Sequence, residues 1–247
     1  MEPHKITVIV PAYNEERYIG RVLGPIKKWQ SRDPKNREFV VVNDGSTDKT
    51  PAVAERYGAK VIYSNPKDPK VNLGKAHAIK AGLMHAKKSG SSVLVTLDAD
   101  TNKLKPEQIE TMVDELRANK CGMVIGRVKP LPGFERFDEH TTEANFYSGE
   151  RAFDIMRLEP WVKGKPKWET PLKGFGFEMA MNHLIPGGMF SEVTFETDFA
   201  RKKMKGRDTA DIWAAHEFFR ERRRRAAELM RKRGAKQPSR ARAKRRA

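Results

Sequence analysis

Residues 93–102 read VLVTLDADTN, an apolar run that leads directly into two carboxylates, Asp98 and Asp100. Successive side chains of a strand point to opposite faces, so carboxylates two positions apart lie on the same side. Mg²⁺ and Mn²⁺ prefer such oxygen ligands and take others from water and substrate phosphates. A short Asp-x-Asp also suits a solvated turn, because Asp is a common turn residue. This stretch alone therefore fits either a divalent-metal site or a surface turn.

Short apolar runs alternate with helical patterns on the N-terminal side of this stretch and shortly beyond it. Strands are expected at residues 6–10, 39–42, 61–63 and 123–126, and in the run that ends at Asp98. Helices are expected at about residues 15–29, 50–57, 75–88 and 106–118. Pro11 is expected to end the first strand, and residues 177–181 fit the start of either a helix or a strand. The alternation predicts an α/β fold with a mostly parallel sheet flanked by helices.

Polar clusters follow three of the expected strands. They are residues 11–15 (PAYNE), 43–46 (NDGS) and 98–100 (DAD). In open α/β sheets, ligands bind outside the carboxyl ends of the strands. We therefore expect the three clusters to converge on one crevice.

The positive charge of the chain is unevenly placed. The 247 residues carry 49 Lys and Arg against 32 Asp and Glu, a net charge of +17. Residues 201–247 hold 19 basic and 5 acidic side chains, whereas residues 1–200 hold 30 and 27. We expect a near-neutral globular domain over residues 1–207, a basic helix over 208–233 and a basic disordered tail over 234–247.

Cysteine content and hydropathy indicate the compartment. Cys121 is the single cysteine, which excludes an intramolecular disulfide framework and fits a reducing environment. No apolar run approaches the roughly 18 residues of a membrane span. Residues 1–5 lack the apolar core of a signal peptide. A cytoplasmic protein is expected.

Four segments, taken together, resemble the family 2 glycosyltransferases, which have the GT-A fold. They are IVPAYNEE at 9–16, VNDGSTDKT at 42–50, NLGKA at 72–76 and LDAD at 97–100. Each follows an expected strand or opens an expected helix, in the order of the family. Later segments are most similar to dolichol-phosphate mannose synthases and related polyprenyl-phosphate glycosyltransferases. These are SGERAF at 148–153, KGFGFEM at 173–179, and Glu192-Val193 with Arg201 beyond.

The resemblance implies a nucleotide-sugar donor site. Asp44 would accept a hydrogen bond from the nucleobase, and the Tyr13 ring would supply an apolar wall. The implied donor-binding residues are Pro11, Ala12, Tyr13, Glu15, Val42, Asp44, Asp98, Ala99, Asp100, Arg127 and Arg201. Local structure offers alternatives, since Asp44 and Ser46 could form an Asx turn and Tyr13 could pack in the core. Lys75 fits a helix start better than a phosphate-binding position.

The resemblance also implies a divalent cation, Mg²⁺ or Mn²⁺. Asp98 and Asp100 would hold it against the donor diphosphate, and Asn102 could add a neutral oxygen ligand. Asp100 is accordingly a catalytic candidate. Arg127 and Arg151 are candidates for anchoring a phosphate, because the guanidinium matches phosphate geometry. A structural salt bridge is the alternative for each arginine.

The implied reaction is inverting transfer of a sugar from a GDP- or UDP-linked donor. A polyprenyl or dolichyl phosphate is the favoured acceptor, and such an anion needs no general base. A hydroxyl acceptor needs a carboxylate, for which Glu178, Glu196 and Asp198 are candidates. The basic segment 201–247 suits an anionic membrane surface, at about 1 kcal/mol per basic residue. The same segment could bind nucleic acid, but no RNA-binding motif accompanies it, so this is the weaker prediction.

Overall fold

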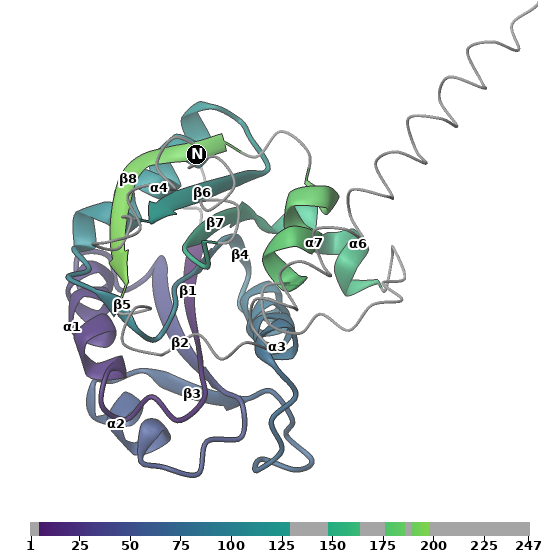
Figure 1. Ribbon diagram of the computed structural model, residues 1–247. Coiled ribbons are helices and arrows are strands. Elements are labelled where there is room, and N and C mark those ends of the chain that lie inside the picture. The colour runs from purple at the N-terminus through teal and green to yellow at the C-terminus, as the bar shows by residue number, and fades with distance from the viewer. Residues whose placement is uncertain (1–4, 129–147, 164–175, 186–188, 198–247) are drawn as a thin grey trace, which may run out of the picture.

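The strands of the protein form one mixed sheet. The structure is a computed structural model that describes residues 5–128, 148–163, 176–185 and 189–197. The strands are β1 (Lys5–Ala12), β2 (Arg37–Asn43), β3 (Lys60–Tyr63), β4 (Ser91–Thr96), β5 (Thr101–Asn102), β6 (Met123–Val128), β7 (Arg151–Asp154) and β8 (Met189–Thr197). Their order is β3-β2-β1-β4-β7-β6-β8-β5 (Figure 1).

Parallel pairing predominates in this sheet, which confirms the expected fold class. β1 pairs in parallel with β2 and β4, β2 with β3, and β6 with β8, whereas β7 runs antiparallel to both neighbours. Thr96 of β4 and Ile125 of β6 both lie opposite Arg151 of β7. β4 and β6 therefore point the same way, and β6 continues three residues beyond the level at which β4 ends. We call the side on which β1, β2, β4 and β6 end the carboxyl edge.

Helices cover both faces of the sheet (Figure 1). They are α1 (Ile19–Gln30), α2 (Thr50–Arg56), α3 (Lys75–Lys88), α4 (Pro106–Ala118), α6 (Glu159–Val162) and α7 (Gly176–Leu184), with a 3₁₀ helix η2 (Ile155–Leu158). One core contains buried side chains of α1, α2 and α4, including Leu23 and Met112. The other contains those of α3, α6 and α7, including Leu83 and Met181. The turns at the carboxyl edge are thus fixed between two packed layers.

The end of β1 and the start of α1 differ from the sequence prediction, β2 and β6 are longer than expected, and one open choice is settled. β1 continues through Pro11 to Ala12. The Ile9 carbonyl points toward β4, where it accepts from the Leu97 N–H. The backbone nitrogen of Pro11, two residues later, points to the same side. It lies beyond Thr96, the last residue of β4 that pairs with β1. Its missing N–H therefore costs no hydrogen bond to β2. Helix α1 begins at Ile19 rather than near residue 15. Residues 177–181 belong to helix α7.

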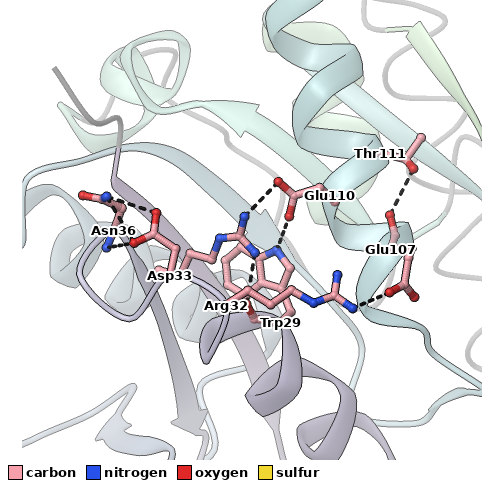
Figure 2. Close-up of polar contacts among 8 residues, drawn as sticks. Trp29, Arg32, Asp33, Asn36, Glu107, Glu110 and Thr111 are labelled. Atoms are coloured by element: carbon pink, nitrogen blue, oxygen red, sulfur yellow. Dashed lines mark hydrogen bonds and ion pairs between the residues drawn. The ribbon is translucent and has the colours of Figure 1, made fainter. Parts of the chain in front are cut away.

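A polar brace joins α1, β2 and α4 near the amino end of β2 (Figure 2). Trp29 Nε1 donates to Glu110 Oε2 over 2.9 Å, and Arg37 Nη2 donates to Glu110 Oε1 over 2.9 Å. The Arg37 guanidinium lies 5.0 Å from the centre of the Trp29 ring. One carboxylate therefore ties three elements together, and we call these three residues the amino-edge brace.

Some predictions fall on parts of the chain outside the described residues. These are the basic helix 208–233, the tail 234–247, and the site candidates Asp198 and Arg201. They stay predictions. Within the described ranges, no helix combines the length and the apolar character that crossing a membrane requires.

Candidate functional site

Asp98 lies directly after β4 at the carboxyl edge and packs on the backbone of Gly149. A Cβ atom at Gly149 would lie 2.4 Å from Asp98 Oδ2 and 2.5 Å from Oδ1, closer than real atoms approach. Thr96 Oγ1 donates to the Gly149 carbonyl over 2.7 Å and holds that segment in place. Residue 149 must therefore be glycine for the Asp98 carboxylate to keep this position.

Lys75, the first residue of α3, bridges two carboxylates at this edge. Its Nζ lies 2.7 Å from Asp98 Oδ1 and 2.7 Å from Glu178 Oε1. Burial lowers the pKa of the Lys75 ammonium, but the charges of Asp98 and Glu178 outweigh burial and raise it above its ordinary value. The helix start predicted at Lys75 is confirmed. The ion pairs were not predicted, and they place Lys75 inside the site.

Glu178 lies in the first turn of α7 with no exposed surface. Its Oε1 pairs with Lys75, and its Oε2 is buried without a hydrogen-bond partner among the described residues. One turn later, Asn182 Oδ1 accepts from Arg151 Nη1 over 2.6 Å. Polar contacts thus join α7 to the carboxyl edge at two successive turns.

Arg151, a predicted phosphate anchor, is fully buried beside β4 and β6. Its Nε donates to the Ser148 carbonyl over 2.7 Å, in addition to the Asn182 contact. Burial lowers the pKa of its guanidinium to about 10, against the opposing charges of Glu178, Glu150 and Asp98. These contacts are hydrogen bonds to neutral groups, and they fix the side chain within the fold. A phosphate-binding role of Arg151 stays a prediction.

Glu150 is a buried acid that sequence reasoning missed. It has no exposed surface, and it accepts hydrogen bonds from Thr101 Oγ1 at 2.8 Å and Ser148 Oγ at 2.9 Å. Burial, together with the nearby charge of Asp98, raises the pKa of Glu150 to about 7. The sequence carries no local signal for this placement, because a charged residue in a Ser-Gly-Glu-Arg run is ordinarily read as exposed.

Asp44, the predicted nucleobase contact, is almost fully buried at the end of β2. Its Oδ1 accepts from the Leu73 N–H at 3.0 Å and from the Ser64 hydroxyl, and its Oδ2 accepts from the Gly74 N–H at 2.8 Å. The alternative that Asp44 forms the local turn is wrong for this structure. The Ser46 N–H donates instead to Asn43 Oδ1 over 3.1 Å. Asp44 anchors residues 64–74 against the carboxyl edge, and its nucleobase role stays a prediction.

The turn after β1 is tied to the turn after β2. The Asn14 N–H donates to Ser46 Oγ over 3.0 Å, and the Glu15 N–H donates to Thr50 Oγ1 over 2.8 Å. These bonds hold residues 14–16 in a bend, with Asn14 at a φ of 56°, and a turn, which explains why α1 begins later than predicted. Tyr13 is 48% exposed, so the alternative that it packs in the core is wrong.

The predicted donor-site residues within the described ranges gather at one edge. Pro11 pairs with Val42 in register, and the Leu97 N–H donates to the Ile9 carbonyl over 3.1 Å, which sets the start of the Asp98 turn beside β1. Ala12 and Ala99 are buried beneath this surface. The three polar clusters thus lie at one edge of the sheet, as expected, and the crevice between them stays a prediction.

Arg127 and Asn102 border the same edge. Arg127 is an exposed residue near the end of β6, and its Nε donates to the Ser191 carbonyl over 2.9 Å. Asn102 lies in β5, where it pairs with Glu196 of β8. The roles of Arg127 as phosphate anchor and of Asn102 as metal ligand stay predictions.

The residues of this edge fit a divalent cation that shares its coordination with a substrate. In the part of the chain that the structure describes, no group of three His, Cys, Asp or Glu gathers into a complete protein-made metal site. Mg²⁺ typically takes one or two carboxylates plus water and substrate phosphates. Asp98 already holds the ammonium cation of Lys75. One carboxylate that attracts a cation, with Asp100 two residues away, matches this donor set.

Comparison with known proteins agrees with the geometry. The 4,4'-diaponeurosporenoate glycosyltransferase of Staphylococcus aureus is 37% identical over 113 residues, which are 45% of this chain and 28% of that relative. The chain thus spans little more than a quarter of the curated relatives it matches.

Solved structures share the fold. Glucosyl-3-phosphoglycerate synthase of Mycobacterium tuberculosis, in complex with Mn²⁺ and UDP-glucose, aligns with a TM-score of 0.58 and 21% identity, covering 78% of this chain and 70% of that chain. Its complex with phosphoglyceric acid aligns with a TM-score of 0.58 and 22% identity, over 78% and 71% of the two chains. The profile described as Glycosyl transferase family 2 matches residues 7–181, more than half of the chain. The protein belongs to glycosyl transferase family 2.

Proposed function

We propose that the protein transfers a sugar from a nucleotide-sugar donor bound at the carboxyl edge, with the help of Mg²⁺ or Mn²⁺. One observation carries the proposal. Asp98 and Asp100 follow β4 at the edge where Asp44 follows β2 and Tyr13 follows β1. Ligands of open α/β sheets bind at this edge. Family membership agrees with the proposal.

Asp98 and Asp100 would hold the cation, with Asn102 as a neutral ligand. The bound cation would neutralise charge that develops on the leaving diphosphate. The Tyr13 ring, 48% exposed, would pack against the nucleoside, and Asp44 would keep residues 64–74 in place around it. Arg127, exposed at the end of β6, would contact a phosphate.

A polyprenyl or dolichyl phosphate is the acceptor that we propose first. The segments at 148–153 and 173–179 are similar to those of dolichol-phosphate mannose synthases. The relative from S. aureus is named for 4,4'-diaponeurosporenoate. A phosphate acceptor is already anionic at neutral pH, so the site needs cations to position it and no general base.

A hydroxyl acceptor is the second candidate, and the register of β5 and β8 favours it. Asn102 pairs with Glu196, and Thr101 pairs with Thr197. The backbone of residues 196 and 197 therefore lies beside residues 101 and 102, which follow the Asp98 turn. Glu196 is the base candidate in this pair of residues, and Asp198 lies outside the described residues. Glu178 is less suited to act as base, because its Oε1 is engaged by Lys75 and its side chain is fully buried. We assign Glu178 a positioning role instead.

The function is tested by nucleotide release. We expect the full chain to release UDP or GDP from a nucleotide sugar with Mn²⁺ and to lose this activity with EDTA. Labelled sugar should then move to one member of an acceptor panel of polyprenyl phosphate, free sugars and phosphoglycerate. Transfer to a hydroxyl that falls with Glu196→Gln would favour the second candidate. No release from any UDP- or GDP-sugar would contradict the proposed function.

A cytoplasmic protein that binds an anionic membrane surface peripherally is part of the same proposal. The support is the charge of residues 201–247, with 19 basic and 5 acidic side chains. Deletion of residues 234–247 should weaken cosedimentation with phosphatidylglycerol vesicles while leaving donor release intact. Unchanged vesicle binding, or tighter binding to RNA than to vesicles, would contradict the membrane role.

A further inference from the structure

The site contains a cation, the Lys75 ammonium, and its two carboxylate partners differ in their access to solvent. Lys75 Nζ contacts Asp98 Oδ1 and Glu178 Oε1 at the same distance, 2.7 Å. Asp98 is 29% exposed and can meet a ligand that arrives from solvent, whereas Glu178 has no exposed side-chain surface. The two ion pairs of Lys75 therefore differ, because only the Asp98 carboxylate can exchange Lys75 for a ligand from solvent.

Glu178 pairs directly with the Lys75 ammonium. Its second oxygen is buried without a hydrogen-bond partner among the described residues. Arg151 is a second buried cation near Glu178, and it donates hydrogen bonds to Ser148, Met123 and Asn182. A buried carboxylate that loses its cation pays a large desolvation cost, so Glu178 retains Lys75 more strongly than the partly exposed Asp98 does.

A divalent ion on Asp98 cannot share the carboxylate freely with Lys75. The Gly149 backbone closes one side of that carboxylate, since a Cβ added at Gly149 would lie within 2.6 Å of the Asp98 carboxyl atoms. The ammonium takes Oδ1 on an open side. Two cations within a few ångströms of each other repel, and the doubly charged one is attracted more strongly by the carboxylate.

We propose that Lys75 and the divalent cation compete for Asp98, and that Glu178 keeps the displaced ammonium beside the metal. Lys75 is then a positioning residue: it holds Asp98 in place before the metal binds, and afterwards it adds a second positive charge at the edge. Because Glu178 belongs to the first turn of α7, metal binding is also coupled to α7. The inference rests on the metal-dependent function proposed above.

Direct competition can be separated from a general effect of charge. Glu178→Gln leaves Lys75 with Asp98 alone, so Mn²⁺ should bind more weakly than to wild type. Lys75→Met removes the competing cation and should strengthen Mn²⁺ binding. The double variant Lys75→Met with Glu178→Gln removes one charge of each sign and keeps the net charge. If charge alone mattered, it would bind Mn²⁺ as wild type does.

The experiment measures the dissociation constant of Mn²⁺ alone by electron paramagnetic resonance of the free ion, using the full chain. We expect the double variant to bind Mn²⁺ about tenfold more tightly than wild type, the scale of outer-shell effects on metal sites. Lys88→Met is the matched control: it removes a lysine from an exposed position at the other end of α3, about 20 Å away. It should leave the constant unchanged.

Equal affinity of wild type and the double variant would overturn the inference. Circular dichroism establishes that each variant is folded, and Lys75→Gln with Glu178→Gln makes the same charge change with two polar side chains if the first pair misfolds. Absence of Mn²⁺ binding in wild type would overturn the inference as well. Donor release in the same preparation reports separately on the proposed function, so its failure is distinguishable from failure of the competition.

Discussion

At the amino-edge brace, Glu110 gives one oxygen to Trp29 and the other to Arg37, each over 2.9 Å. At the carboxyl edge, by contrast, a single ammonium serves two carboxylates, Asp98 and Glu178. The brace satisfies both oxygens of its acid, whereas the carboxyl edge leaves one oxygen of Glu178 buried without a partner among the described residues. The two clusters belong to one sheet but differ in how completely their charges are matched.

The difference separates stability from function. A matched cluster lowers the free energy of the folded state, and a ligand gains little by approaching it. An edge with excess negative charge is less favourable for folding, but it attracts a cation. We therefore expect substitutions at the brace to change the free energy of unfolding, and substitutions at the carboxyl edge to change catalysis. The following predictions test whether stability and catalysis depend on different edges of the sheet.

The largest effect is expected from the two aspartates after β4. Asp98→Asn and Asp100→Asn remove negative charge from the proposed metal ligands, so Mn²⁺-dependent donor release should fall at least about 100-fold. The urea midpoint of each variant should stay close to that of wild type. Turnover that survives in both variants would refute the metal assignment.

Gly149→Ala should have the next largest effect. The added Cβ would lie 2.4 Å from Asp98 Oδ2, so the carboxylate must move, and donor release should fall by about 10- to 100-fold. Gly24→Ala, in helix α1, is the control, because apart from its chain neighbours its Cβ would meet Tyr57 at an ordinary 3.7 Å. That variant should keep its activity. Equal activity of the two variants would show that the position of Asp98 does not matter.

Glu110→Ala should act in the opposite sense, on stability alone. It leaves Trp29 Nε1 and Arg37 Nη2 without their acceptor, which should cost about 1–2 kcal/mol in urea unfolding. Specific donor release below the unfolding transition should be unchanged. Asp114→Ala, at an exposed position on the same helix, serves as control and should change neither quantity. A loss of activity in folded Glu110→Ala would break the division between the two edges.

The smallest effects concern pH, and they have opposite signs at two carboxylates. Burial alone would raise the pKa of Glu38, but His85 and Lys5 outweigh burial and lower it below 4.5. Its stabilisation is present above pH 4.5 and is lost as pH falls through the folded pKa. The pKa of Glu150 is raised to about 7, so its contribution to the stability of the folded state is largest below pH 4.5. This contribution is lost as pH rises from 4.5 through 7.

Urea midpoints between pH 3 and 8.5 test these signs. Glu38→Gln should flatten the acid side of the stability profile, and Glu150→Gln should flatten the side around neutral pH. Both variants keep side-chain size nearly constant, so packing changes are small. The same flattening in both variants, or none, would contradict the assigned signs.

Local patterns predicted much of the fold. Helices at 75–88 and 106–118 are confirmed with the same bounds, because apolar spacing and Pro106 define them within a single segment. The carboxyl-edge clusters were also predicted, since each follows its own strand. The predicted start of α1 was wrong because residues distant in sequence bind its first turn. Thr50 and Asp48 accept hydrogen bonds from the N–H groups of Glu15 and Glu16, so the helix begins later.

The charge network of the site could not be predicted in the same way. The contact from Lys75 to Glu178 spans 103 positions, and the contact from Thr101 to Glu150 spans 49. No periodicity within one segment encodes such pairs. Gly149 likewise appears as an ordinary glycine until its approach to Asp98 is known.

The most direct test of the central claim is the position of a bound metal. Crystals grown with Mn²⁺ and UDP should give an anomalous peak at the carboxyl end of β4, about 2 Å from a carboxylate oxygen of Asp98 or Asp100 and in contact with the diphosphate. A peak and nucleotide bound away from this edge, for example on the basic segment 201–247, would contradict the account.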